Sequence, residues 1–380
     1  MESNEKLPIR ILHMIGSLNI GGSQAMVMNL YRKIDRTKIQ FDFIIDRPDE
    51  LFYAEEIERL GGRIYVLPTF NGANYFSIKK NWNSFFSKHD EYKILHSHIR
   101  SYASIFIPIA KKHGLKTIIH SHSTSNGSGL NAILKTVLQF PLRFQADYFF
   151  ACSNEAAKWL FGKQILNKRN FKLMKNSIDS TRFSNALKSR FEDRKKLGLN
   201  DVFTLGFLAR VTNAKNPIFA LEVFYYYNLL NKKSKMLFVG DGPLLNEVKD
   251  KAKKMNIYNN IVFTGERSDV EKMFSVMDFY VFPSLWEGLG ISLIEAQASG
   301  LNCVCSENIQ DEAIFTKNVT KLNLSVGAKK WAKTIYNIQN NIRTDNNELV
   351  KKAGFDIADN VNALTSFYTN LYNEKFEVDL

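Results

Sequence analysis

The chain of 380 residues contains few cysteines, few prolines and no apolar run long enough to cross a membrane. Its three cysteines, Cys152, Cys303 and Cys305, are odd in number and lie in apolar segments typical of buried strands. This pattern fits a reducing compartment and gives no sign of a disulfide framework. The polar start MESNEKLP leads directly into an apolar segment and does not resemble a signal peptide. We therefore expect a cytoplasmic protein, with peripheral attachment to the inner face of the plasma membrane left open.

Acidic residues are also in the minority, with 38 Asp and Glu against 51 Lys and Arg, which gives a net charge of +13. Such a balance indicates an acidic partner, and nucleic acid, an anionic membrane surface and a phosphorylated substrate are the candidates. No nucleic-acid-binding module is recognisable, and the basic residues are scattered without interleaved aromatic residues. The length exceeds that of one typical core and predicts two domains.

Apolar strand-like runs alternate with helical patterns along the chain, which predicts parallel sheets wound on both faces. The first run, at 9–15, is followed by a loop with Gly21 and Gly22 and by a helix over 24–34, for which Ser23 is the expected N-cap. A strand, a glycine loop and a helix in this order form a phosphate-binding arrangement, although the glycine spacing departs from the dinucleotide fingerprint.

The most informative stretch is VFPSLWEGLGISLIEAQASGL, at 281–301. It predicts a buried strand at 279–282, a turn containing Gly290, and a helix from 291 to 299. Two carboxylates frame this turn, because Glu287 stands near the strand end and Glu295 lies about one turn into the helix. Between them, the amides of the first helical turn can hold a phosphate.

Within this stretch, PSLWEGLGISLIEAQASG resembles the donor-site signature of glycosyltransferase family 4, a family of retaining enzymes with the GT-B fold. The resemblance implies two doubly wound, Rossmann-like parallel-sheet α/β domains that face a central cleft. We expect an acceptor-binding domain at 1–183 and a nucleotide-sugar donor domain at 184–360. The C-terminal helix at 361–380 is expected to cross back to the first domain.

The resemblance also implies roles for individual residues. Glu287 would bind hydroxyl groups of the donor sugar and Glu295 the ribose. Arg210 and Lys215, on the loop after the strand FTLGFL, would bind the donor diphosphate together with the backbone amides of Gly290 and Ile291. The further donor-binding residues that we expect are Gly21, Gly22, Gly240, Gly265, Arg267, Gly290 and Ile291.

Two strands end in the same tripeptide, at 96–98 and 120–122, with the sequence His-Ser-His. Histidines two apart on a strand share a face, so each pair could chelate a metal ion. The chain lacks a clear Asp-x-Asp motif and shows no third ligand near either pair, so we expect no metal and no cofactor. By resemblance, His120 is the acceptor-side histidine next to the transferred sugar, with His122 as the alternate; His98 either joins that side or is a satisfied loop histidine.

The segment 123–145 begins polar and continues as LNAILKTVLQFPLRFQ, with Lys135 and Arg143 among apolar residues. One interpretation is a helix on an anionic membrane surface. The other is a helix packed on the sheet and ended or kinked by Pro141.

These patterns together predict a glycosyltransferase that moves a hexose or N-acetylhexosamine from a nucleotide sugar, expected to be a UDP-sugar, to a hydroxyl acceptor. The expected acceptor is a lipid-linked oligosaccharide in capsule or exopolysaccharide synthesis. The alternatives are a GT-B sugar-nucleotide epimerase or hydrolase and, from a different class, a basic nucleic-acid-binding protein.

Overall fold

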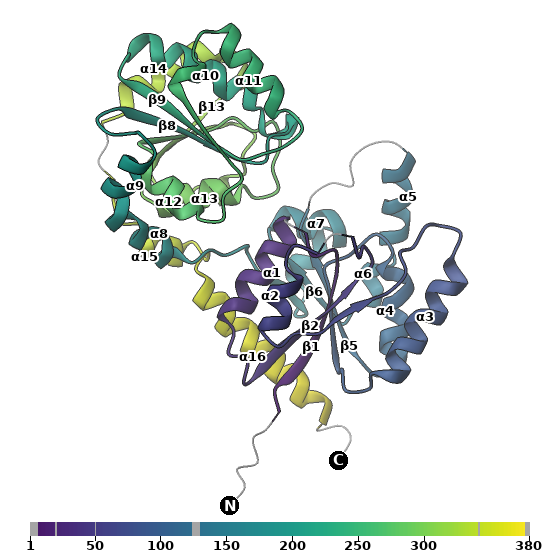
Figure 1. Ribbon diagram of the computed structural model, residues 1–380. Helices are drawn as coiled ribbons and strands as arrows, with labels where there is room; N and C mark the ends of the chain where they lie inside the picture. Colours follow the sequence, from purple (N-terminus) through teal and green to yellow (C-terminus); the bar gives the residue numbers. More distant parts are fainter. Residues whose placement is uncertain (1–6, 20, 50, 124–129, 341–342, 377–380) are drawn as a thin grey trace, which may run out of the picture. The chain divides into compact units, whose positions relative to one another are not determined.

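The computed structural model describes residues 7–19, 21–49, 51–123, 130–340 and 343–376. The chain divides into two compact units, which are both visible in Figure 1. Unit 1 comprises Met1–Ser177 and Ile357–Leu380, and unit 2 comprises Ile178–Asp356. Each unit contains one parallel sheet with helices on both faces, so the expected fold class of two doubly wound α/β domains is confirmed.

The sheet of unit 1 has seven parallel strands in the order β3-β2-β1-β4-β5-β6-β7. The winding reverses between β1 and β4, and ligands of such sheets bind at this switch point, outside the carboxyl ends of the strands. The strands are β1 (Ile9–Gly16), β2 (Ile39–Ile45), β3 (Ile64–Val66), β4 (Ile94–Ser97), β5 (Lys116–Ser121), β6 (Tyr148–Ala151) and β7 (Phe171–Leu173).

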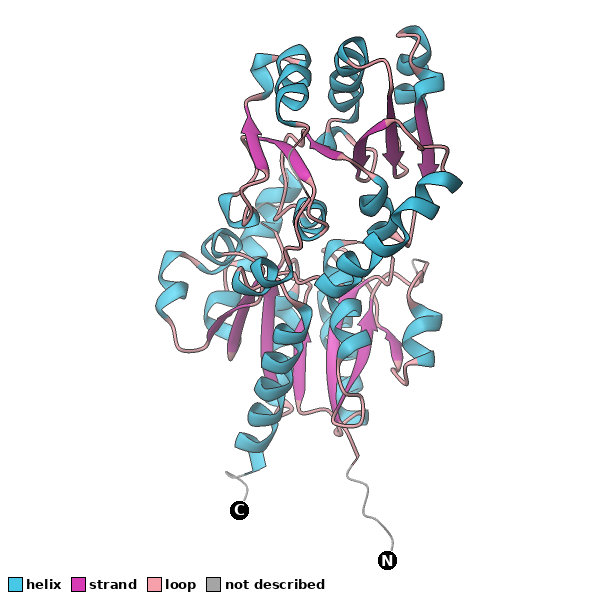
Figure 2. Cartoon of the chain, turned by 90° about the vertical axis from the view of Figure 1, so that its left-hand side faces the viewer, coloured by secondary structure: helices cyan, strands magenta, loops and turns pink. Residues whose placement is uncertain are grey.

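Two apolar cores cover the two faces of this sheet. Helices α1, α2 and α16 contribute to one core, and α3, α4, α6 and α7 contribute to the other. Figure 2 shows the long C-terminal helix α16 running alongside the strands of unit 1. The helices of this unit are α1 (Gly22–Lys33), α2 (Ala54–Arg59), α3 (Tyr75–Lys88), α4 (Ala103–Lys112), α5 (Leu130–Gln139), α6 (Leu142–Gln145), α7 (Asn154–Phe161) and α16 (Ile357–Phe376).

The sheet of unit 2 has six parallel strands in the order β10-β9-β8-β11-β12-β13, with its switch point between β8 and β11. The strands are β8 (Phe203–Leu208), β9 (Ser234–Val239), β10 (Ile261–Gly265), β11 (Phe279–Phe282), β12 (Asn302–Ser306) and β13 (Val319–Leu322).

Helices α10, α11 and α14 share one core of unit 2, and α8, α12, α13 and α15 share the other. The helices of this unit are α8 (Ser180–Ala186), α9 (Arg190–Lys196), α10 (Pro217–Leu230), α11 (Leu245–Lys254), α12 (Val270–Val276), α13 (Ile291–Ala298), α14 (Ala328–Ile338) and α15 (Asn347–Lys352).

Several boundaries differ from those expected. Ser23 lies inside α1, whose N-cap is Gly21, so the prediction that Ser23 caps the helix is wrong. The chain passes into unit 2 after Ser177 rather than at 184, because Phe183 of α8 packs in a core of unit 2. It returns to unit 1 at Ile357 rather than at 361.

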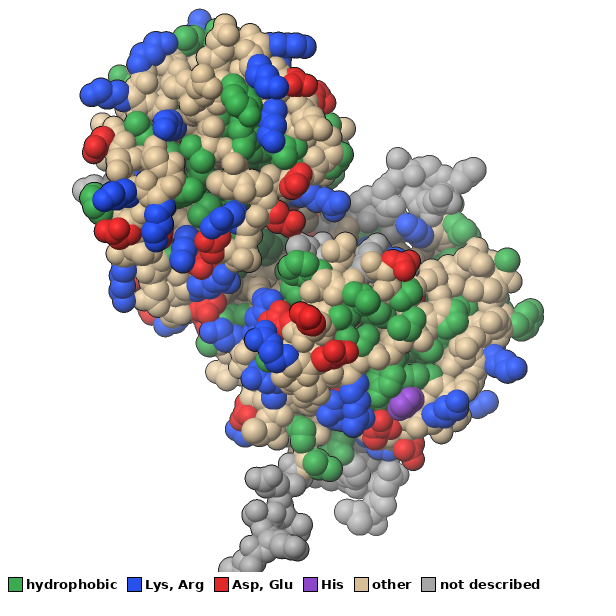
Figure 3. Space-filling model, in the orientation of Figure 1, with side chains coloured by type: hydrophobic (Ala, Val, Ile, Leu, Met, Phe, Trp, Pro, Cys, Tyr) green, Lys and Arg blue, Asp and Glu red, His purple; other side chains and the backbone are tan. Residues whose placement is uncertain are grey.

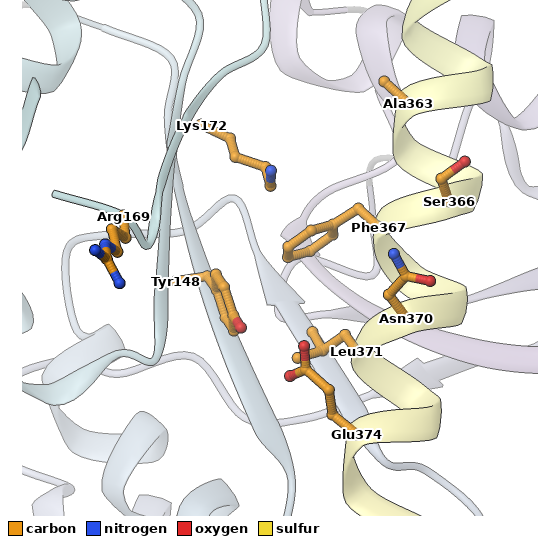
Figure 4. Close-up of a pocket in the computed structure, with 9 residues that line it drawn as sticks. All are labelled: Tyr148, Arg169, Lys172, Ala363, Ser366, Phe367, Asn370, Leu371 and Glu374. Carbon is orange, nitrogen blue, oxygen red and sulfur yellow. The ribbon is translucent and has the colours of Figure 1, made fainter.

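A pocket of 290 Å³ lies in unit 1 between α16 and the strands β6 and β7. In Figure 4 the side chain of Lys172 points toward the ring of Phe367, and its Nζ lies 5.4 Å from the ring centroid. Tyr148 stands at the start of β6, so this pocket is away from the carboxyl ends of the strands. It contains none of the residues that the sequence singles out.

On the face of the molecule that Figure 3 shows, the basic side chains do not gather in one dominant patch. Figure 3 shows Lys and Arg side chains distributed over the visible face of both units, with acidic side chains among them. Among the described residues, no helix combines the length and the apolar character that a membrane span requires.

Candidate active site

In unit 2, a short loop joins β11 to α13 at the switch point of the sheet. Gly290 immediately precedes α13 and has a φ of +78°, in the left-handed region that favours glycine. A Cβ at this position would lie 3.2 Å from the ring of Phe282, which also limits the space. Since the first amides of a helix have no intrahelical partner, Ile291 and its neighbours provide an anion site at the carboxyl edge.

Lys215 and Glu287 form an ion pair at this edge. Nζ of Lys215 donates a hydrogen bond to Oε1 of Glu287, and the Ser284 hydroxyl donates to the same oxygen over 2.8 Å. The Glu287 side chain is only 8% exposed and that of Lys215 26%, so water screens the pair weakly. The amide of Leu285 also donates to the carbonyl of Ala214 over 2.8 Å, which ties together the loops after β8 and β11.

The other basic candidates of unit 2 differ in what they contact. Arg210 is exposed at the end of β8, and within the described part of the chain its guanidinium has no ion-pair partner. Arg267 is bound by the carboxylate of Asp269 through two hydrogen bonds of 2.8 and 2.7 Å, which raise the pKa of the guanidinium. Arg210 can therefore bind an anion directly, whereas Arg267 must first release or share Asp269.

Gly240 follows β9 and Gly265 ends β10, and the reason for a glycine differs between the two positions. A Cβ at Gly240 would lie 2.0 Å from the carbonyl oxygen of Ala209, so the loops after β8 and β9 touch through their backbones. Gly265 has a φ of +68° and open space around it. Gly240 is thus required for packing, and Gly265 is the position at which a ligand could approach the backbone.

Glu295 lies on α13 and is partly buried. Burial raises the pKa of its carboxyl to about 8, Arg182 opposes this shift, and Glu271 adds to it. At neutral pH most of this carboxyl is therefore protonated and can donate as well as accept a hydrogen bond.

The glycine loop of unit 1 leads from β1 into α1. Gly21 has an extended backbone with φ of −167°, and a Cβ at Gly22 would meet no atom within 4 Å. Neither backbone conformation requires a glycine. The open space at Gly22 is available to a ligand. Gln24 lies beside this loop and donates to the Ser17 hydroxyl over 3.2 Å.

Five of the seven histidines gather at the carboxyl ends of β1, β4 and β5. His13 and His96 are register partners, and His98 and His122 follow their strands by one residue. Three nitrogen pairs lie within hydrogen-bond distance: His13 Nδ1 and His98 Nε2 at 3.0 Å, His98 Nδ1 and His122 Nε2 at 2.8 Å, and His96 Nε2 and His120 Nδ1 at 3.3 Å. From α16, the Tyr368 hydroxyl lies 2.6 Å from His96 Nδ1.

Burial lowers the pKa of all five imidazoles below the ordinary value of 6.5, and that of His98 falls to about 3. The imidazoles are therefore neutral at physiological pH, which is the state that binds hydroxyl groups and metal ions.

The structure brings together residues that the sequence presented separately. His120, His122 and His98 are neighbours, so the expectation that no third ligand lies near either His-Ser-His pair is wrong. The error arose because β1, β4 and β5 are adjacent in space but distant in the chain. The sequence analysis missed His13, for which a single polar residue inside the apolar run IRILHMI was the available signal, and considered His96 only as half of a chelating pair.

Two family models together account for most of the chain. Residues 20–182 match the model of Glycosyltransferase Family 4, and residues 189–353 match that of Glycosyl transferases group 1. The chain is 31% identical over 384 residues to the putative glycosyltransferase EpsF of Bacillus subtilis, and the match covers 99% of each chain. The chain belongs to glycosyltransferase family 4.

Other relatives of this family 4 glycosyltransferase have more specific names. An Escherichia coli protein named UDP-Gal:alpha-D-GlcNAc-diphosphoundecaprenol alpha-1,3-galactosyltransferase is 27% identical over 269 residues, which cover 67% of this chain and 69% of the relative. The structure of Anabaena HepE in complex with UDP and glucose has a TM-score of 0.74 at 14% identity and covers 95% of this chain and 100% of its own.

The expected fold and enzyme class are thereby confirmed: this family 4 glycosyltransferase has the GT-B fold and is a transferase of glycosyl groups. Its two switch points present different chemistry, an ion pair with a buried acid in unit 2 and neutral imidazoles in unit 1.

Proposed function

We propose that this enzyme transfers a hexose or N-acetylhexosamine from a UDP-sugar to a hydroxyl group of a lipid-linked oligosaccharide, with retention at the anomeric carbon. The step would belong to capsule or exopolysaccharide synthesis, on the cytoplasmic side of the membrane. The observation that carries the proposal is the Lys215–Glu287 pair beside the start of α13 at the switch point of unit 2. The names of the E. coli relative and of the HepE complex support the same substrate classes.

In this proposal, the donor diphosphate binds to Arg210, Lys215 and the amides of Gly290 and Ile291. A diphosphate would compete with Glu287 for the Lys215 ammonium group, and Glu287 would then be released to accept hydrogen bonds from sugar hydroxyls. Both exchanges use groups that the unliganded chain already holds in place, which lowers the cost of reorganisation.

The buried acid of α13 suits the ribose. A protonated Glu295 carboxyl can donate one hydrogen bond and accept another, and ribose hydroxyls offer both partners. Gly240, Gly265 and Arg267 would line the remainder of the donor site, with Gly265 as the position of closest backbone approach. Gly21 and Gly22 would approach the donor from unit 1.

Charge development at the reacting carbon explains the proposed chemistry. As the glycosidic bond loosens, the sugar becomes similar to an oxocarbenium ion and the leaving diphosphate gains negative charge. Arg210 and Lys215 would stabilise that charge, so the donor site needs no metal ion or other cofactor. The leaving phosphate would take the proton of the acceptor hydroxyl, which attacks from the same face.

Neutral imidazoles suit the acceptor side. His120, with His122 and His98 next to it, could accept a hydrogen bond from a sugar hydroxyl.

An exposed apolar surface of unit 1 supports a lipid-linked acceptor. Along α5 and α6, five apolar side chains are between 54% and 75% exposed, and they are Ile133, Leu134, Val137, Phe140 and Phe144. Lys135 is exposed among them, and the Arg143 guanidinium lies 5.0 Å from the ring centroid of Phe140. Apolar side chains interspersed with cations are suited to the surface of an anionic bilayer. The initial segment 124–129 of this region lies outside the described residues.

Vesicle binding tests this membrane surface. The double variant Val137→Ser/Phe144→Ser should bind vesicles containing anionic lipid several-fold more weakly than the wild type in a sedimentation assay, because two apolar groups are lost. Phe76→Ser is the matched control, since Phe76 is 84% exposed on α3, outside this surface. Equal binding by all three proteins would contradict the assignment.

Thermal unfolding with a panel of UDP, GDP, ADP and their sugars, with and without magnesium, tests the donor. A ligand at a hundred times its dissociation constant adds about 2.7 kcal/mol, which is readily measured. We expect selective stabilisation by uridine nucleotides that does not depend on magnesium. Stabilisation by another base alone would contradict the UDP assignment, and release of free or epimerised sugar with no transfer product would favour a hydrolase or an epimerase.

A further inference from the structure

The histidine cluster of unit 1 contains more imidazoles than a hydroxyl acceptor requires. His98, His120 and His122 come from adjacent parallel strands, and one ring nitrogen of each lies within 4.8 Å of the others. A tetrahedral Zn²⁺ with Zn–N bonds of about 2.0–2.1 Å separates its ligand nitrogens by roughly 3.4 Å. The closest contact in this group, 2.8 Å between His98 Nδ1 and His122 Nε2, needs only a small opening to reach that value.

Unsatisfied nitrogen atoms occur in the same place. Nε2 of His120, Nδ1 of His122 and Nε2 of His13 are buried and have no hydrogen-bond partner among the described residues. Buried polar atoms almost always have a partner, and an ion bound through Nε2 of His120 would supply the one that this atom lacks. The 2.8 Å contact is compatible with a hydrogen bond between two neutral imidazoles, and a cation between the two nitrogens would replace that shared proton.

The remaining hydrogen bonds match those that surround ligating histidines. If His98 binds an ion through Nδ1, its Nε2–H can donate to His13 Nδ1 over 3.0 Å. If His120 binds through Nε2, its Nδ1–H can donate to His96 Nε2 over 3.3 Å. His96 then donates from Nδ1 to the Tyr368 hydroxyl over 2.6 Å. Such outer partners fix the tautomer and the orientation of metal ligands.

We propose that His98, His120 and His122 form a binding site for a divalent transition-metal ion of the Zn²⁺ type, with the fourth coordination position open to water or a hydroxyl group. Three imidazoles without a carboxylate favour Zn²⁺, Co²⁺, Ni²⁺ or Cu²⁺ over Mg²⁺ and Ca²⁺, which prefer oxygen ligands. The site contains no donor-binding residue of unit 2. It shares its histidines with the acceptor side proposed above, so with the ion bound an acceptor hydroxyl would take the open fourth position in place of the hydrogen bond to His120.

His98, His120 and His122 are preferred to the second group, His13, His96 and His98, for two reasons. His122 is partly exposed at the end of β5, which gives an ion a route of entry, whereas His13 and His96 are 2% and 1% exposed. In addition, the Tyr368 hydroxyl already occupies Nδ1 of His96.

The test is titration of the full chain, without an oligohistidine tag, with Co²⁺ in chelator-free buffer, followed by absorption spectroscopy and equilibrium dialysis. We expect one Co²⁺ per chain, a tetrahedral-type visible spectrum, displacement by Zn²⁺ and no competition from Mg²⁺. His98→Ala and His122→Ala should each weaken Co²⁺ binding at least about tenfold. Loss of a residue that only supports a metal ligand costs about tenfold or more, so loss of a ligand should cost no less.

His89→Ala and His113→Ala are the matched controls, because they are the two histidines outside the cluster and should leave Co²⁺ binding unchanged. Thermal unfolding without metal identifies any variant that does not fold; His122→Asn, at the partly exposed strand end, then replaces it. Absence of Co²⁺ binding by the wild type, or full binding by a folded His98→Ala/His122→Ala variant, would overturn the proposal. UDP stabilisation is measured separately, so a failure of this site is distinguishable from a failure of the proposed function.

Discussion

At the carboxyl edge of its sheet, unit 1 presents uncharged imidazoles, whereas unit 2 presents a lysine paired with a glutamate. Both edges are switch points of parallel sheets with the same winding, so topology gives the location in each unit and the side chains give the chemistry. In unit 1 the histidines stand on or just after the strands. In unit 2, Lys215 ends a short 3₁₀ turn, Glu287 stands on the loop after β11 and Glu295 stands on a helix.

Removing either charge of the Lys215–Glu287 pair should have the largest effect, which is on turnover. Glu287→Gln and Lys215→Ala should each lower turnover by about a hundredfold or more, the scale of one lost interaction with a charged transition state. Steady-state transfer assays measure this. Lys251→Ala is the matched control, since it removes an ion pair of 3.2 Å with Glu222 that is more exposed. Near-normal turnover of both variants would remove these residues from the site.

The glycine loops of the two units offer a second contrast. Gly240→Ala should lower the free energy of unfolding by about 2 kcal/mol or more, because its Cβ would collide with the Ala209 carbonyl at a φ of +129°. Gly22→Ala has open space in α1 and should change stability by less than about 1 kcal/mol, in the stabilising direction. Urea unfolding measures both. Equal stability changes would show that the backbone contact at Gly240 can relax.

A smaller effect, on the pH dependence of the free energy of unfolding, should follow from the burial of Glu295 in unit 2. Because the folded chain keeps the Glu295 proton up to about pH 8 while the unfolded chain loses it near 4.5, the free energy of unfolding falls as pH rises through that interval. Glu295→Gln stays neutral throughout and should remove this part of the slope. Thermal unfolding between pH 4.5 and 8 measures it, with Glu247→Gln on the exposed face of α11 as the matched control. The same slope in wild type and Glu295→Gln would contradict the burial argument.

Local sequence predicted some elements closely and others poorly. The strand at 279–282 is observed as predicted, since an apolar run bounded by Pro283 leaves little choice. The start of α1 was misplaced because Gly22 has a low helix propensity and yet lies in the helix. The C-terminal helix was expected at 361–380, but α16 begins four residues earlier, because its apolar residues bury against unit 1 from Ile357 onward.

By itself, the sequence indicated the class of enzyme, because the stretch at 281–301 resembles the donor-site signature of glycosyltransferase family 4 at many positions. It also determined where parallel strands and helices alternate. Only the tertiary structure decided which strands became neighbours: β1 with β4, and β8 with β11. That choice placed Lys215 beside Glu287, gathered five histidines, and buried Glu295 deeply enough to raise its pKa. Such contacts depend on crossover connections and burial, which no local stretch of sequence contains.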